Sequence, residues 1–232
     1  MADDPTATRK KFLLARYVKR FNERNPTRRI PIPAKFDYNP NYVGEAAREL
    51  LRSMQGATGL DVTGYFNKPT MRKLLPPGIR GEVMACVHAE VGEHEWPPSS
   101  NMGEIVKYLH SVGLGGGYPW CAAFATWVLK EEGFKHFPPG PASADSWGRW
   151  AQQKGITKPR NASLFGDLWC WEWGNSDGML DHIGFCDEGI NGVTAYYVDG
   201  NVGAYGGSVT DASRAAGNIA VTIDLVKLHS LR

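Results

Sequence analysis

The sequence predicts an α+β fold, in which an antiparallel sheet with helices on one side follows a small all-α module. Apolar residues recur with the period of a helix as far as residue 153, and the period changes to two from residue 168, so helices come first and strands later. Between residues 43 and 75, a helix, a glycine-rich loop and a second helix form a unit too small to bury much core alone. This unit therefore indicates an appended module.

The helices are expected at 9–25, 43–54, 68–75, 80–93, 105–112, 119–132 and 146–153, and the strands at 168–173, 182–186, 194–198 and 219–228. The first helix has a narrow apolar stripe among basic residues, and the prolines of 26–41 indicate an extended connector after it. The sequence Pro76-Pro77-Gly78 ends the third helix, and the glycines at 115–117 end the fifth. These breaks predict two parts, residues 1–78 and residues 79–232.

The composition is that of an ordinary soluble globular protein, with 42% hydrophobic and 22% charged residues among 232. The net charge of +2 is too small to indicate a nucleic-acid partner, and we expect none. Basic residues are nevertheless concentrated between Arg9 and Arg29, where Glu23 is the single acidic residue. This basic arm would be attracted to an anionic envelope polymer or a membrane surface; the alternatives are a solvated helix face and a nucleic-acid contact.

The N-terminal sequence predicts no signal peptide, because Met1 is followed by Asp3, Asp4 and a basic stretch rather than by an apolar segment. We therefore expect synthesis in a cytoplasm without use of the usual secretion route. In that reducing compartment the four cysteines, which lack any metal-binding spacing, should be free thiols, most of them buried. They are Cys86, Cys121, Cys170 and Cys186.

Cys121 is the first candidate catalytic residue. Pro119 suits the first turn of a helix, so Cys121 falls where unpaired N–H groups and the positive end of the helix dipole favour a thiolate. The helix is apolar on nearly all sides, which predicts that it is buried. Cysteine hydrolases hold their nucleophile in such a position. The alternative is that Cys121 is only a core residue.

His182 opens a predicted strand in which His182, Gly184 and Cys186 share one face, and Gly184 leaves space beside the imidazole. The next strand ends in Asp199-Gly200-Asn201, which a hairpin would bring close to His182. A polar group on the far ring nitrogen fixes the tautomer and stabilises the imidazolium. Asp199 or Asn201 can do this, and Asp199 is slightly favoured; a simple turn is the alternative reading of 199–201.

The segment 88–95 is rich in residues that can bind metals, but it lacks the spacing of an HExxH site. We interpret it as a solvated helix face.

Residues 50–75 resemble the type 1 peptidoglycan-binding domain, a small three-helix unit. The family has a loop of the form G-L-x-V-T-G followed by a T-x-x-x-L helix, which correspond here to residues 59–64 and to Thr70 and Leu74. The family usually has Asp after the loop, where this chain has Asn67. A generic helical hairpin is the alternative.

A second resemblance covers residues 80–232. It rests on PWCAAF at 119–124, Gly166-Asp167 before a Trp-rich strand, DHIGF at 181–185 and DGN at 199–201. Together these runs are similar to the CHAP domain, a papain-like family of cysteine, histidine-dependent amidohydrolases and peptidases that cleave peptidoglycan.

The CHAP resemblance implies that Cys121 is the nucleophile and His182 the general base, and that Asp199 and Asn201 are the family's polar positions after the histidine. Tyr118 and Trp120, which lie beside the thiol in the sequence, are expected to contact substrate. Some family members bind calcium through an acidic loop before the cysteine. No such loop precedes Cys121, so we expect no cofactor and no metal.

Both resemblances lead to the hypothesis of a monomeric bacteriophage endolysin, held in the host cytoplasm until lysis and then acting on the cell wall or in the periplasm. It would cleave an amide bond of the peptide stem or cross-bridge through a thioester. The alternatives are a secreted toxin-like amidase, a phage tail hydrolase and a non-catalytic cell-wall-binding protein. The sequence leaves open whether the enzyme is an N-acetylmuramoyl-L-alanine amidase or an endopeptidase.

Overall fold

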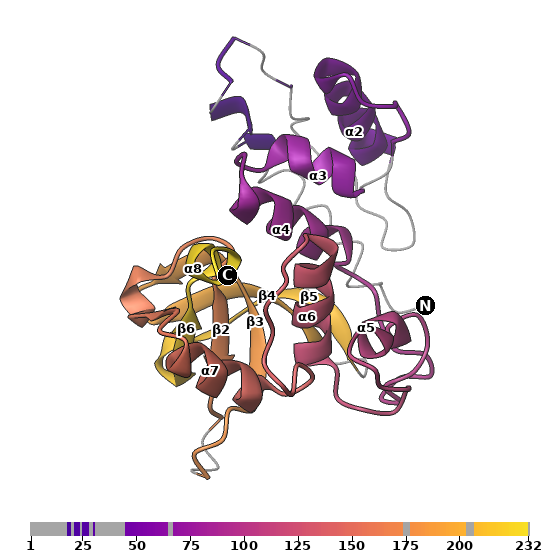
Figure 1. The fold of residues 1–232 in the computed structure, drawn as a ribbon. Helices are drawn as coiled ribbons and strands as arrows, with labels where there is room; N and C mark the ends of the chain where they lie inside the picture. The colour runs from indigo at the N-terminus through magenta and orange to yellow at the C-terminus, as the bar shows by residue number, and fades with distance from the viewer. Residues whose placement is uncertain are drawn as a thin grey trace. The chain divides into compact units, whose positions relative to one another are not determined.

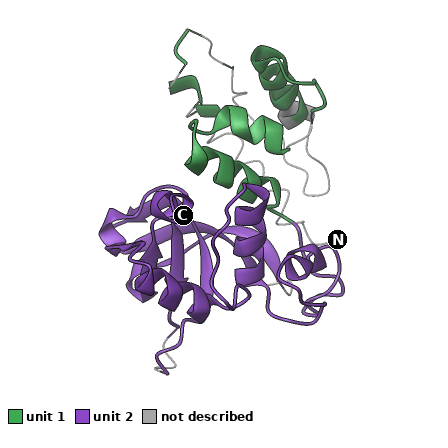
Figure 2. Cartoon of the chain, in the orientation of Figure 1, with its two compact units in different colours: residues 1–92 green, residues 93–232 purple. Residues whose placement is uncertain are grey.

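A computed structural model describes residues 18–19, 21–23, 25–27, 30, 45–64, 67–173, 177–202 and 207–231. The chain divides into two compact units, residues 1–92 and residues 93–232 (Figure 2). The predicted division after residue 78 lies before helix α4 (Ile79–Ala89), which falls within the first unit. The division into a wall-binding part and a catalytic part stays a prediction.

The described part of the first unit consists of helices and loops. It contains α2 (Glu45–Thr58), α3 (Lys68–Leu74) and α4, at the positions that the apolar periodicity predicts. Most of the predicted basic helix 9–25 lies outside the described residues; within it, residues 18–19 and 21–23 are helical. None of the helices in the described ranges combines the length and apolar character needed to cross a membrane.

A buried glutamine organises the glycine-rich loop of the first unit. The Gln55 side chain accepts hydrogen bonds from the backbone N–H groups of Thr63 (3.0 Å) and Gly64 (2.8 Å), and it donates to the Thr70 hydroxyl of α3 (3.0 Å). Asn67 caps α3 by accepting from the backbone N–H of Thr70 (3.0 Å). The residues that resemble a wall-binding motif are therefore joined to both helices through one side chain.

The second unit contains a six-stranded sheet with strand order β1-β6-β2-β3-β4-β5 (Figure 1). Its strands are β1 (Thr157–Lys158), β2 (Leu168–Trp171), β3 (His182–Asn191), β4 (Thr194–Val202), β5 (Ser208–Ala215) and β6 (Ile219–Ile223). Every pairing in this sheet is antiparallel. The predicted α+β, papain-like class is confirmed.

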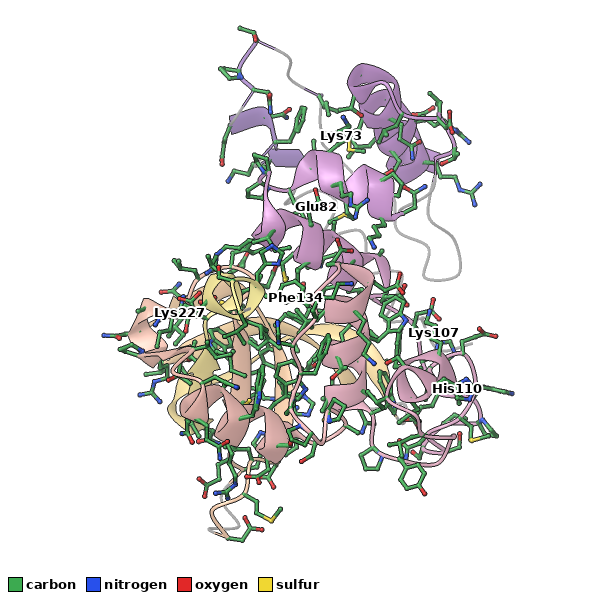
Figure 3. The ribbon with its side chains drawn as sticks, viewed as in Figure 1. Lys73, Glu82, Lys107, His110, Phe134 and Lys227 are labelled. Carbon is green, nitrogen blue, oxygen red and sulfur yellow. The ribbon has the colours of Figure 1, made fainter. Side chains whose placement is uncertain are left out.

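Four helices accompany the sheet: α5 (Val106–Ser111), α6 (Cys121–Glu131), α7 (Ala144–Gln153) and α8 (Leu225–His229). Of these, α6 packs on β3 and β4, and α7 packs on β2 and β6 (Figure 1). Phe134, just after α6 (Figure 3), contacts His229 of α8 with ring centroids 5.0 Å apart. These contacts fix α6 between the sheet and its neighbouring helices.

Strand alternation gives the sheet two apolar faces. Ile183 and Phe185 lie on the face covered by α6, and Phe185 contacts Phe124 of that helix with ring centroids 6.2 Å apart. The neighbouring positions along the strands, which point to the opposite face, form a second buried cluster that contains Trp169, Trp171 and Tyr197. Because both faces are buried, the central strands are held on two sides.

Three elements of the structure differ from the prediction. Strand β5 was not predicted, because its sequence Ser-Val-Thr-Asp-Ala-Ser-Arg-Ala is polar, as an edge strand allows. The predicted strand 219–228 is wrong beyond Ile223, since the Asp224 side chain accepts from the N–H groups of Val226 (3.0 Å) and Lys227 (3.3 Å) and so starts α8. The short strand β1 was also missed.

Asp167, part of the motif before the Trp-rich strand, has a structural position. Its carboxylate is completely buried, pairs with Lys158 at 2.8 Å and accepts from the backbone N–H groups of Leu164 (2.8 Å) and Leu225 (3.1 Å). It therefore ties β1, the turn before β2 and α8 together.

Candidate active site

Cys121 is the first residue of α6, and Trp120 is the N-cap. The helix was predicted from residue 119, two residues before its actual start, and the thiol lies at the N-terminal end of the helix as expected. The N–H groups of a first helical turn have no partners within the helix, so they and the helix dipole favour negative charge at the Cys121 sulfur. Cys121 is 8% exposed, so the nucleophile is largely but not completely buried.

Aromatic packing fixes the start of α6. The Trp120 ring is completely buried and stacks on Tyr108 of α5, with centroids 5.4 Å apart. Gly200 of β4 lies so close that a Cβ atom there would be 2.5 Å from the Trp120 ring and 3.0 Å from the Cβ of Phe124. A glycine is therefore required where the end of β4 crosses the nucleophile segment.

His182 opens β3 and is hydrogen-bonded to Asp199 of β4, with 2.5 Å between Nε2 and a carboxylate oxygen. Both side chains are almost fully buried. Gly184 makes this contact possible, because a Cβ atom there would lie 2.5 Å from the Cβ of Asp199. Since Nε2 is occupied by Asp199, Nδ1 is the ring nitrogen available to Cys121.

The electrostatic surroundings of His182 favour its protonated form. Burial by itself lowers the pKa of the imidazole, but the negative charges of Asp199 and of the Cys121 thiolate, together with hydrogen bonds to both side chains, raise the pKa to about 10. The structure thus brings Cys121, His182 and Asp199 together as one hydrogen-bonded series. A protonated His182 is the state that this arrangement stabilises.

Asn201 occupies a different place from Asp199. Its φ of 63° lies in the left-handed region that asparagine tolerates, and the pairing of β4 with β5 is irregular between Asp199 and Val202. With its amide oriented to satisfy both neighbours, Asn201 accepts from the backbone N–H of Trp120 (3.2 Å) and donates to Glu95 (3.2 Å). The backbone departs from the extended conformation at this residue, so Asn201 contacts Trp120 and Glu95 while Asp199 contacts His182.

Glu95 is a buried residue at the site that the sequence analysis missed. It is 2% exposed and accepts from the indole N–H of Trp120 (2.9 Å) and the backbone N–H of Asn101 (3.0 Å). The interpretation of 88–95 as a solvated face is wrong for His88 and Glu95, which are both buried. The mixture of charged and apolar residues in this segment gave no indication that His88 and Glu95 are buried. The adjacent Trp96-Pro97, which is typical of a structured turn, could have indicated it.

The two predicted substrate-contacting residues differ in exposure. Tyr118 is 53% exposed just before the nucleophile, as a substrate contact requires. Trp120 has no exposed surface, and its indole donates a hydrogen bond to Glu95 and stacks on Tyr108. A contact between Trp120 and substrate stays a prediction, and its burial does not support it.

All four cysteines are free and buried. Burial raises the pKa of the Cys170 thiol strongly, and the nearby charge of Cys121 adds to this effect. Among the described residues, no group of three or more His, Cys, Asp or Glu side chains is placed to hold a metal ion.

Comparison with known proteins agrees with this geometry. Residues 113–201 match the family model described as the CHAP domain. This range contains Cys121, His182, Asp199 and Asn201, and it implies a cysteine- and histidine-dependent amidohydrolase whose substrate is peptidoglycan. No curated protein and no solved structure matches the chain significantly.

The charge of Asp199 should set the alkaline limit of activity. In Asp199→Asn the largest cause of the raised pKa of His182 is lost, so the imidazolium should lose its proton at lower pH. The alkaline limb of the pH profile of kcat/KM should therefore move towards neutral pH from its wild-type position. NMR titration of the His182 ring would report the same shift directly. An unchanged titration would show that Asp199 does not hold the proton on His182, and Asp177→Asn, at an exposed position, is the control.

Proposed function

We propose that this protein is a peptidoglycan hydrolase that cleaves an amide bond of the peptide stem or cross-bridge by Cys121–His182 catalysis. The observation that carries the proposal is the series Cys121, His182 and Asp199 inside the range that matches the CHAP domain. The reaction is acyl transfer, with Cys121 as nucleophile, His182 as general base and acid, and Asp199 as the residue that orients the imidazole.

The mechanism has two steps. The Cys121 thiolate attacks the amide carbon, and the backbone N–H of Cys121 at the start of α6 stabilises the oxyanion. His182 then gives its proton to the leaving amine, and the C–N bond breaks to leave a thioester on Cys121. In the second step His182 takes a proton from water, the resulting hydroxide attacks the thioester, and a carboxylic acid and the free thiol result.

For the N-terminal unit we propose a role in wall binding. Support comes from the resemblance of residues 50–75 to the type 1 peptidoglycan-binding domain and from the order that Gln55 gives to the loop carrying the motif. A wall-binding unit joined to an amidohydrolase suits a bacteriophage endolysin that reaches the cell wall at lysis. A toxin-like amidase and a phage tail hydrolase use the same chemistry, and they are the alternatives to an endolysin.

Mass spectrometry of purified peptidoglycan tests the proposal. Wild type should release fragments with new amino and carboxyl termini, and the fragment masses identify the bond. Cys121→Ala should release none, because no other side chain in the series can form the acyl intermediate, and it should still sediment with the walls. Equal release by both proteins would contradict the cysteine mechanism. Sedimentation of both without any release from several wall types would favour a non-catalytic wall-binding protein.

A further inference from the structure

An exposed aromatic residue covers the candidate general base. Trp173 follows β2, and its indole stacks on the His182 ring with centroids 4.9 Å apart and planes inclined by 24°. The Trp173 backbone N–H donates to the carboxylate of Asp181 at 2.7 Å, so Trp173 is anchored to the residue that precedes His182. Trp173 is nevertheless 42% exposed, which leaves part of its surface free for a ligand.

An arginine lies on the same indole. The Cζ of Arg214, on edge strand β5, is 4.4 Å from the centre of the Trp173 ring. Its Nε donates to the hydroxyl of Tyr197, whose ring is buried against Trp171 with centroids 4.9 Å apart. The guanidinium is thus positioned by a ring and a hydroxyl. Within the described part of the chain, no carboxylate forms an ion pair with Arg214.

The position of His182 places Trp173 and Arg214 on one side of the scissile bond. The general acid must reach the leaving amine, so the portion of the substrate that carries the amine passes over His182 rather than away from it. A residue stacked on His182 therefore lines the leaving-group side. A half-buried guanidinium held on an aromatic ring presents its Nη groups in a planar fork, which matches the geometry of a carboxylate.

We propose that Trp173 and Arg214 form a subsite that binds a carboxylate of the stem peptide on the leaving-amine side of the bond that is cut. This inference rests on the proposed peptidoglycan hydrolase function and specifies the substrate further. Trp173 supplies the apolar wall and keeps Arg214 near His182, and Arg214 supplies the charge-assisted hydrogen bonds. The enzyme should therefore distinguish stem peptides with a free carboxylate from those in which it is a carboxamide.

Two synthetic stem peptides test the subsite, after digestion of whole peptidoglycan has identified the bond. They carry that bond and differ only in a carboxylate or a primary carboxamide on the leaving-amine side. Wild type should have a kcat/KM about ten- to a hundredfold higher for the carboxylate, as expected for a charge-assisted hydrogen bond. Arg214→Gln should lose this preference by slowing cleavage of the carboxylate alone. Arg214→Lys should keep part of it, and Lys227→Gln, at an exposed position of α8, should change neither rate.

The comparison between substrates separates recognition from a structural role. If Arg214→Gln lowered both rates equally, Arg214 would support the fold or His182 and the carboxylate subsite would be wrong. If wild type cleaved the two peptides equally, the inference would fail while the hydrolase proposal stood. If wild type cleaved neither the peptides nor whole peptidoglycan, the hydrolase proposal and this inference would both fail.

Discussion

His182→Ala should lower the rate of amide hydrolysis by about 10⁴-fold, at the upper end of what general acid–base catalysis contributes. The substitution removes the base that forms the thiolate, the acid that protonates the leaving amine and the cation that balances Cys121. In the wild-type protein all three depend on one imidazole, held by Asp199 at 2.5 Å and with a pKa raised to about 10. The effect is therefore larger than for a residue that contributes to a single step.

Rates on whole peptidoglycan and thermal unfolding of the same samples provide the measurement. His110→Ala is the matched control, because His110 is an exposed histidine on α5 (Figure 3). The control should keep wild-type activity, and both variants should remain folded. Activity of His182→Ala within tenfold of wild type would exclude His182 as the general base.

Glu95→Ala should have the largest effect on stability, a decrease of about 2–4 kcal/mol in the free energy of unfolding of the second unit. The carboxylate accepts from the buried indole N–H of Trp120 and the backbone N–H of Asn101, and both donors would lose their acceptor. Asn201 would lose a partner as well. Because Trp120 is the N-cap of α6, the variant should also show a lower kcat, since Cys121 is less firmly placed.

Denaturation followed by tryptophan fluorescence measures this loss. Glu104→Ala, at an exposed position close in sequence, should change stability by no more than about 0.5 kcal/mol. Glu95→Gln keeps the shape of the side chain and one accepting oxygen, so it should lie between wild type and Glu95→Ala. If Glu95→Ala were as stable as Glu104→Ala, the buried carboxylate would not hold the nucleophile segment.

The parts of the site that the sequence predicts are those with local patterns. A proline, a run of apolar residues and a cysteine were enough to place Cys121 at the start of a buried helix. Alternation in β3 placed His182 and Gly184 on one face, and the structure adds that Gly184 makes room for Asp199 in particular. Each of these predictions depends on residues within one helix or one strand.

The parts that the sequence does not predict depend on contacts between distant segments. The choice between Asp199 and Asn201 was open, because only the turn at Asn201 sends one side chain to His182 and the other to Trp120. Glu95 lies in a loop, and its partners belong to α6 and β4. Trp173 follows β2 and Arg214 lies on β5, so the two residues are far apart in the sequence. The roles of the site residues stay predictions until the variants are measured.

The unequal burial of the four thiols should allow the concentration of active sites to be titrated with a thiol reagent. Cys170 and Cys186 have no exposed surface, Cys86 is 2% exposed, and only Cys121 among the four reaches 8%. The strongly raised pKa of Cys170 keeps that thiol protonated and unreactive at neutral pH. A small alkylating reagent should therefore modify one sulfur per folded chain, so the label taken up reports the concentration of competent sites in any preparation without a substrate being needed.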